Sequence, residues 1–172
     1  LLKNLEFDLA FTSDLIRAQD TLKIILEGIG QNDIPIEKNM ALNERDYGDL
    51  VGRNKAEAAE EFGAEQVHIW RRSYDVPPPG GESLKGTADR VIPYLREVIM
   101  PHISEGKQIL VSAHGNSIRA IVMVLQDYTS EQILKTEIGW CEPWIFDFEN
   151  DIVKNLEILA RADCKSMSQL PD

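Results

Sequence analysis

One stretch of the sequence decides the fold class: Gln108-Ile-Leu-Val-Ser-Ala-His114-Gly-Asn116-Ser-Ile-Arg119. Its first part, Ile109–Val111, is a short apolar run that is typical of a buried strand. Polar residues follow at His114–Ser117, with Asn116 or Ser117 as the expected helix N-cap. Apolar residues then recur at helical spacing, namely Ile118, Ile121, Val122 and Leu125. A strand therefore passes into a helix through a glycine turn that carries a histidine.

His114 occupies a favourable place for a functional residue. In a parallel α/β sheet this turn lies at the carboxyl end of a strand, which is where ligands bind. The free N–H groups and the dipole of the following helix favour an anion at the same place. His114 is therefore a candidate site residue, although a buried histidine that only caps its own turn is an open alternative.

A second strand–turn–helix unit is expected near the start of the sequence. Phe7–Phe11 alternates as a short strand, Ser13 is the expected N-cap, and helical spacing runs from Asp14 until two glycines follow. Arg17 lies in the first turn of this helix and would face the same end of the sheet as His114. Two such units predict a three-layer α/β/α fold, in which helices flank a mostly parallel sheet.

The other elements follow from local patterns. We expect the end of a helix at 1–5, an extended segment at 34–37, helices at 55–62, 64–72, 83–99 and 130–137, and strands at 144–148 and 152–158. Ser130 is the expected N-cap of its helix, Pro93 should kink or divide the long helix, and Pro101 should end it. Residues 1–159 are expected to form one domain, and residues 160–172 a mobile polar tail.

Composition and charge narrow the classes of function. With 172 residues, 43% hydrophobic and 27% charged, the chain suits one ordinary globular domain. A net charge of −11 argues against binding to nucleic acid or to an anionic membrane surface, and the sequence has no apolar run of membrane-spanning length. Cys141 and Cys164 lack metal-ligand spacing and cannot build a disulfide framework, so we expect a reducing cytoplasm.

Positive side chains recur beside the expected turns and helix ends: Arg17, Lys55, Arg71, Arg72 and Arg119. Paired guanidinium groups such as Arg71 and Arg72 suit phosphate or carboxylate, because each can donate two parallel hydrogen bonds. Glu44 lies in the irregular segment 42–48, where a carboxylate close to cations could transfer protons. The alternatives are a solvated helix end for the arginine pair and an ordinary surface turn for Glu44.

Several motifs together resemble the cofactor-dependent phosphoglycerate mutases. Three of them are Leu42-Asn43-Glu44-Arg45-Asp46-Tyr47-Gly48, Gly52-Arg-Asn54-Lys55-Ala-Glu57 and Trp70-Arg71-Arg72-Ser-Tyr-Asp75. Three more fit in the same order: Thr12-Ser13-Asp-Leu15-Ile-Arg17-Ala18, Gly81-Glu82-Ser83-Leu84-Lys85 and Ala113-His114-Gly115-Asn116-Ser117. The resemblance runs from about Phe7 to about Leu134. The glutamate loop and the double arginine together distinguish these mutases from the wider histidine phosphatases.

This resemblance implies the interconversion of 3-phosphoglycerate and 2-phosphoglycerate in glycolysis and gluconeogenesis. The reaction would proceed through a phosphohistidine, with 2,3-bisphosphoglycerate as primer and without a metal. Glu44 matches the proton donor of the family, His114 its second active-site histidine, and Arg17 the arginine that holds the phosphoryl group. The matched substrate-binding positions are Arg17, Glu44, Arg45, Tyr47, Lys55, Arg71, Arg72, Gly115 and Asn116. The implied partner is a small anionic phosphorylated substrate, and the family suggests a homodimer.

The sequence departs from the family in two places. The phosphoryl-accepting Arg-His-Gly motif is absent, and we expect that an N-terminal portion of the protein carries it. His68 and His102 cannot replace it, because they lie in or beside expected helices rather than at a strand end. The family places the strand that carries this motif in the middle of the sheet. Without that strand the sheet is expected to expose an apolar edge and to have a central gap. The segment Gly139-Trp-Cys-Glu-Pro143 also differs from the usual turn of the family.

Two other functions are open at this stage. A phosphatase of the same superfamily would share Arg17, Glu44 and His114 but would have less need for Lys55 and the arginine pair. A catalytically inactive protein that binds phosphorylated acids would account for the absent motif.

Overall fold

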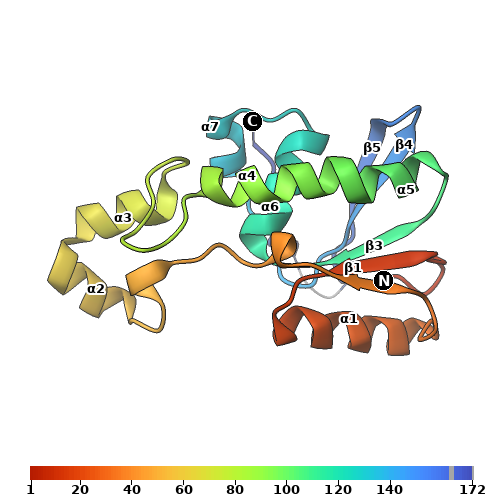
Figure 1. Cartoon of the computed structure of the whole chain (residues 1–172), viewed down its shortest axis with the longest axis horizontal. Coiled ribbons are helices and arrows are strands. Elements are labelled where there is room, and N and C mark those ends of the chain that lie inside the picture. Colours follow the sequence, from red (N-terminus) through yellow and green to blue (C-terminus); the bar gives the residue numbers. More distant parts are fainter. Residues whose placement is uncertain (163–164, 172) are drawn as a thin grey trace.

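The computed structural model describes residues 1–162 and 165–171, without the side chain of Lys55. In this part of the chain, the main sheet has three parallel strands in the order β2-β1-β3 (Figure 1). Their bounds are Leu9–Thr12 for β1, Ile36–Lys38 for β2 and Ile109–Ser112 for β3. A separate antiparallel hairpin consists of β4 (Trp144–Glu149) and β5 (Ile152–Ile158). The predicted pairing of the last two strands is confirmed.

Helices cover both faces of the main sheet (Figure 1). One face is covered by α1 (Ile16–Ile29), whose Leu22 and Leu26 pack against Ala10 of β1. The other face is covered by α4 (Leu84–Tyr94), a π-helical turn (Leu95–Ile99), α5 (Met100–Ser104) and α6 (Gly115–Leu125). The three-layer α/β/α fold predicted from the sequence is confirmed.

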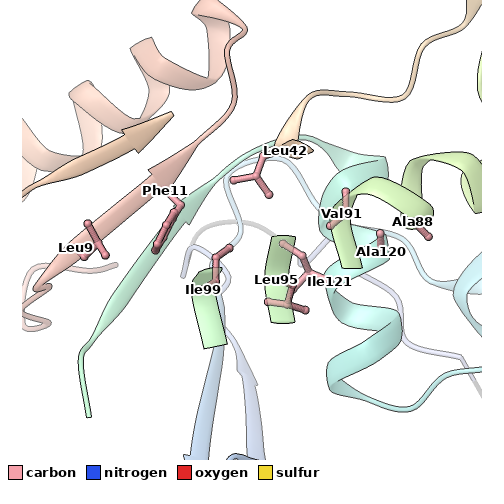
Figure 2. Close-up of a cluster of buried hydrophobic side chains, with 9 residues drawn as sticks. All are labelled: Leu9, Phe11, Leu42, Ala88, Val91, Leu95, Ile99, Ala120 and Ile121. Carbon is pink, nitrogen blue, oxygen red and sulfur yellow. The ribbon is translucent and has the colours of Figure 1, made fainter. Parts of the chain in front are cut away.

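The larger core lies between β1 and the helices α4 and α6. Leu9 and Phe11 alternate with Ala10 along β1, so they point away from α1 and into this core. Figure 2 shows their side chains with those of Val91 and Ile121 from the two helices. Because both faces of β1 are covered, all four of its residues are buried. This core fixes the end of β1, which is followed by Ser13 and then by Arg17 in the first turn of α1.

Strand β3 is less completely covered than β1. In the described residues it pairs with β1 alone, so one of its edges carries no strand. Ile109, Leu110 and Val111 are consequently only half-buried, although each is apolar. The sheet therefore has the exposed apolar edge that the sequence analysis expects.

The two prolines of the long helical segment act differently. Pro93 lies inside α4, and the helix passes at Leu95 into a π-helical turn, in which Met100 N–H bonds to the Leu95 carbonyl. The prediction that Pro101 ends the segment is wrong. Pro101 lies in the first turn of α5, where an N–H group is not needed. The expected helix end at 1–5 is also wrong: these residues form a turn closed by Leu5 N–H and the Leu2 carbonyl at 3.0 Å.

Three helices begin at a residue other than the expected one. Leu15 rather than Ser13 is the N-cap of α1, and His114 rather than Asn116 or Ser117 is that of α6. Helix α7 (Ser130–Lys135) has Thr129 rather than Ser130 as its N-cap, because the Thr129 side chain accepts a hydrogen bond from the Gln132 N–H. Ser13 and His114 are thereby left at the sheet end, where their side chains can meet.

Two short helices extend from one side of the sheet (Figure 1). They are α2 (Lys55–Phe62) and α3 (Ala64–Arg72), both as predicted. Leu50, Ala58, Val67 and Trp70 form a small core between them and the preceding segment. That segment contains two 3₁₀ turns, Met40–Leu42 and Gly48–Leu50, with the irregular residues 43–47 between them. The helical pair thus supports the loop that carries Glu44.

The C-terminal residues have fixed contacts, where the sequence predicted a mobile tail. The Glu142 carboxylate accepts hydrogen bonds from the Ser166 hydroxyl, the Met167 N–H and both the N–H and hydroxyl of Ser168. These bonds lower the pKa of Glu142 to about 2, the Ser168 side chain contributing most. Glu137 and Gln169 form an isolated antiparallel bridge. Cys164 lies outside the described residues, and Cys141 is an exposed free thiol.

Candidate active site

The carboxyl ends of β1 and β3 meet at one edge of the sheet, since Thr12 pairs with Ser112. Ser13 and His114 follow these strands, and Ser13 Oγ lies 2.7 Å from His114 Nε2. Ser13 Oγ also accepts a hydrogen bond from Leu15 N–H at 3.2 Å. The Ser13 hydroxyl hydrogen is then available for a neutral imidazole.

The surroundings of His114 favour its neutral form. The residue is 7% exposed. Burial, followed by the positive charge of Arg17, lowers the pKa of His114 below its usual value, while the nearby Glu44 carboxylate opposes this shift. A histidine with a lowered pKa is uncharged near neutral pH, so this imidazole can accept as well as donate a hydrogen bond.

The carboxylate of Glu44 lies at the N-terminus of α6. Its Oε1 accepts hydrogen bonds from the Asn116 N–H at 3.2 Å and from Asn116 Nδ2 at 3.0 Å. The Arg45 N–H donates to the same oxygen at 2.7 Å. A helix N-terminus favours negative charge. The carboxylate also lies beside Gly115, where an added Cβ would make an ordinary van der Waals contact with Glu44 Oε2 at 3.9 Å.

A pocket of about 650 Å³ opens beside this carboxylate. The residues with charged or aromatic side chains that line it include Arg17, Glu44, Arg45, Tyr47 and Arg71. The lining residues thus supply three guanidinium groups and the carboxylates of Glu44 and Asp46. Such a site suits a small anion and can also exchange a proton with it.

Tyr47 organises two of the arginines. The Cζ atoms of Arg45 and Arg71 lie 4.4 and 5.8 Å from the centroid of its ring. The Tyr47 hydroxyl accepts a hydrogen bond from Asn116 Nδ2 at 3.3 Å. Arg45 is only 3% exposed and donates to the Trp70 carbonyl at 3.3 Å, yet its buried Nε has no hydrogen-bond partner among the described residues. A buried donor without a partner is costly, so the burial of this nitrogen lowers the stability of the loop that carries Arg45.

The structure does not bring all the expected residues into the pocket: His114, Gly115 and Asn116 lie beside Glu44 but are not among the lining residues. Arg72 is not among the lining residues, and its Nη1 lies 2.9 Å from a carboxylate oxygen of Glu137. Arg119 binds the other oxygen of Glu137 at 2.7 Å. Lys55 begins α2, but its side chain lies outside the described part of the chain.

A family model described as the histidine phosphatase superfamily (branch 1) matches residues 1–157. The chain belongs to this superfamily. It is 55% identical over 148 residues to a protein of Parvibaculum lavamentivorans, covering 86% of this chain and 70% of the relative. It is 57% identical over 147 residues to a protein of Bradyrhizobium sp., covering 86% and 71%. Both relatives are named 2,3-bisphosphoglycerate-dependent phosphoglycerate mutase.

Two solved structures of phosphatases share the fold at low sequence identity. The α-ribazole phosphatase from Shigella flexneri is 24% identical, with a TM-score of 0.73, and the match covers 92% of this chain and 76% of that one. A mycobacterial glucosyl-3-phosphoglycerate phosphatase is 22% identical, with a TM-score of 0.69 and coverage of 87% and 76%.

His114 is the histidine of this superfamily member that lies at the site. His68 is exposed on α3. His102 is half-buried on α5, where Nδ1 contacts Lys107 Nζ at 3.0 Å and Glu105 at 3.6 Å. Neither residue lies directly after β1 or β3, at the strand ends where Ser13 and His114 meet. The expectation that they cannot act as the phosphoryl acceptor therefore agrees with their positions.

Sequence reasoning missed three residues next to this site. Ser13 was assigned as a helix cap, although its place directly after β1 could have suggested contact with a residue that follows β3. Arg90 donates hydrogen bonds to the Ala41 and Glu44 carbonyls, and Glu82 accepts one from the Asp46 N–H. The sequence gives neither residue a role, and Glu82 appears only within the motif 81–85. The available signal was weak: Arg90 is a charged residue directly before the buried Val91.

No helix in the described ranges is long and apolar enough to cross a membrane. The same ranges hold no group of three or more histidine, cysteine, aspartate or glutamate side chains with a geometry suited to a metal ion.

Proposed function

We propose that this chain belongs to a 2,3-bisphosphoglycerate-dependent phosphoglycerate mutase, which interconverts 3-phosphoglycerate and 2-phosphoglycerate in glycolysis and gluconeogenesis. One observation carries the proposal: Asn116 holds the Glu44 carboxylate in the same pocket as Arg17 and Arg71. A proton-exchanging group among arginines is what transfer between two hydroxyls of a phosphorylated acid requires. The relatives with more than half of their aligned residues identical bear the same name.

Each residue has a role in this proposal. Glu44 accepts the proton of the substrate hydroxyl as that oxygen attacks phosphorus, and it returns a proton to the oxygen that leaves. Arg17 neutralises charge on the phosphoryl group, and the neutral imidazole of His114 hydrogen-bonds to it. Arg71, together with the substrate-binding residues Arg45, Tyr47, Lys55, Arg72, Gly115 and Asn116, orients the acid. Catalysis of this kind is mostly positioning and charge stabilisation.

We further propose that the phosphoryl-accepting histidine belongs to a segment outside residues 1–172. The unpaired edge of β3 supports this, because an added strand there would end beside His114. Attack by the substrate hydroxyl then breaks the phosphorus–nitrogen bond to that histidine and forms the new phosphorus–oxygen bond.

The pocket fits 2,3-bisphosphoglycerate, the primer of this reaction, because Arg17, Arg45 and Arg71 can neutralise a small polyanion. When bound, the primer supplies the phosphoryl group. No metal is needed in this proposal, since the arginines carry the positive charge.

Three features of the whole protein are also proposed. Residues 1–159 form the catalytic domain and residues 160–172 a C-terminal tail, in which Ser166, Met167 and Ser168 bind Glu142. The protein is a homodimer, for which the exposed edge strand β2 offers a surface with Ile36 41% exposed. The exposed thiol of Cys141 suits a reducing compartment, the cytoplasm.

The test is a coupled assay on the full-length natural protein. Conversion of 3-phosphoglycerate is followed by consuming the 2-phosphoglycerate formed, with and without 2,3-bisphosphoglycerate. We expect activity that depends on the primer and falls by about 100-fold or more in Glu44→Gln, a range typical of general acid–base catalysis. Primer-independent release of inorganic phosphate would instead indicate a phosphatase, and binding without turnover would indicate an inactive phospho-acid-binding protein.

A further inference from the structure

The guanidinium group of Arg90, on α4, holds the main chain of the loop that carries Glu44. Its Nη1 donates to the carbonyls of Ala41 at 2.7 Å and Met40 at 3.3 Å. Its Nη2 donates to the carbonyl of Glu44 itself at 3.1 Å. Arg90 therefore contacts the loop at its beginning and at the residue whose carboxylate enters the pocket.

The remaining donors of Arg90 bind Glu82. Nε lies 3.0 Å from Glu82 Oε1, and Nη2 lies 2.9 Å from Oε2. An arginine has five N–H donors, so all of them are used in these five bonds. The side chains of Arg90 and Glu82 are 24% and 30% exposed, so both are partly shielded from water. This makes the forked pair more rigid than a surface ion pair.

Glu82 in turn binds the far end of the loop. Its Oε2 accepts hydrogen bonds from the Asp46 N–H at 3.3 Å and the Thr87 hydroxyl at 3.2 Å, and its own N–H donates to the Asp46 carbonyl at 2.7 Å. Burial alone would raise the pKa of Glu82, but the bonds from Arg90 and Asp46 lower it. Glu82 is therefore an anion at neutral pH, and it can orient Arg90.

We propose that Arg90, oriented by Glu82, is a positioning residue for Glu44. The pair fixes the main chain at residues 41, 44 and 46, while Asn116 fixes the carboxylate at the opposite end of the Glu44 side chain. The inference rests on the proposed function, because it assigns Arg90 to the proton-transfer step. Arg90 does not line the pocket, so binding of the substrate anion does not depend on it directly.

The geometry gives an expected size for this effect. Proton transfer needs the carboxylate within about 2.6–3.2 Å of the substrate oxygen. A displacement of about 1 Å can cost on the order of 100-fold in rate. Replacing Arg90 by Lys keeps a cation for Glu82 but cannot supply the forked bonds to the Ala41 and Glu44 carbonyls.

A double-mutant cycle on the full-length natural protein tests the proposal. Arg90→Lys should lower the mutase kcat by about 10- to 100-fold while the KM for 3-phosphoglycerate stays within about threefold. In a Glu44→Gln background, the same replacement should lower kcat by less than about twofold, because the group that Arg90 positions is already lost. Equal losses in both backgrounds would overturn the proposal, since a general structural role acts whether or not Glu44 is present.

Two further variants complete the test. Glu82→Gln is nearly isosteric and keeps a hydrogen-bond acceptor for Arg90. It should lower kcat by less than Arg90→Lys does, with the same dependence on Glu44. The proposal is therefore still tested if Arg90→Lys fails to fold. Lys85→Gln removes an exposed ion pair to Asp89 on the same helix and should leave kcat unchanged. Wild-type mutase activity with no effect of Arg90→Lys or Glu82→Gln would overturn this inference alone. A wild-type protein without mutase activity would overturn the proposed function and the inference with it.

Discussion

Replacing Gly48 by Ala should disturb both the stability of the chain and the loop that carries Glu44. Gly48 has a φ of +53°, in the left-handed region that favours glycine. A Cβ at this position would lie 2.2 Å from the Pro79 carbonyl oxygen and 2.4 Å from the Gly81 nitrogen. Both neighbours are main-chain atoms, so a side chain cannot rotate away to make room, and the 79–81 segment must move.

The expected loss can be built from two parts. The left-handed backbone costs a residue with a Cβ about 1 kcal/mol. Displacement of the 79–81 segment weakens two hydrogen bonds, from the Asp49 N–H to the Pro79 carbonyl and from the Glu82 N–H to the Asp46 carbonyl. At about 1 kcal/mol each, these bring the total to about 3 kcal/mol of unfolding free energy. In a chain of this size that lowers Tm by roughly 6–12 °C.

Gly30→Ala is the matched control for this prediction. Gly30 also has a left-handed backbone, with a φ of +77°, but no atom lies within 4 Å of an added Cβ. It should lose only the backbone part, about 1 kcal/mol, or roughly 2–4 °C in Tm. Urea and thermal unfolding of the two variants measure the difference. If Gly48→Ala is no less stable than Gly30→Ala, the close approach of the two loop segments is refuted.

Three other predictions follow from the same structure. The pKa of His114 is lowered on folding, so the unfolded chain binds more protons than the folded one as the pH drops below about 6.5, and the unfolding free energy should fall. Between pH 7.5 and 5.5, the Tm of His114→Gln should therefore fall less than that of the wild type. Glu142→Gln should speed hydrogen exchange at the main-chain N–H groups of Met167 and Ser168, because their bonds to the carboxylate are otherwise present at every pH well above about 2. Unchanged exchange would contradict the docked tail. Arg71→Gln should raise the KM for 3-phosphoglycerate by about 10-fold or more, as expected for loss of a charged hydrogen bond. Arg72→Gln should raise the KM less, because Arg72 is paired with Glu137 and does not line the pocket. Equal effects of the two variants in a steady-state assay would refute this difference between the arginines.

Elements formed by residues close in sequence could be predicted well. The strand and helix that flank His114, and those that flank Arg17, each show their own periodicity within about 20 residues. Two such units determine a parallel sheet with helices on both faces, which the structure confirms. Segment 1–5 was too short to show any periodicity, and its apolar residues were wrongly assigned to a helix.

The candidate site was only partly visible in the sequence. The turn after β3 showed His114 because a strand and a helix meet there. The clamp formed by Arg90 and Glu82 could not be predicted, because Arg90 and Ala41 are 49 positions apart and no local pattern relates them. Contacts of this length depend on how α4 packs across the sheet, and that packing follows from the fold as a whole.

The contacts of the C-terminal segment could not be predicted from its sequence either. Its composition is polar and without period, which is typical of a mobile tail. Its contacts come from one carboxylate, Glu142, that lies 24 to 26 positions earlier in the chain. A single residue that gathers several hydrogen bonds leaves no periodic trace in the sequence.

The proposed mutase reaction is tested most directly by ³¹P NMR of the full-length natural protein with 3-phosphoglycerate and a trace of 2,3-bisphosphoglycerate. The account predicts that the resonance of 3-phosphoglycerate falls while that of 2-phosphoglycerate rises to a constant ratio, with no inorganic phosphate formed. Accumulation of inorganic phosphate without 2-phosphoglycerate, or no change in either resonance, would contradict it.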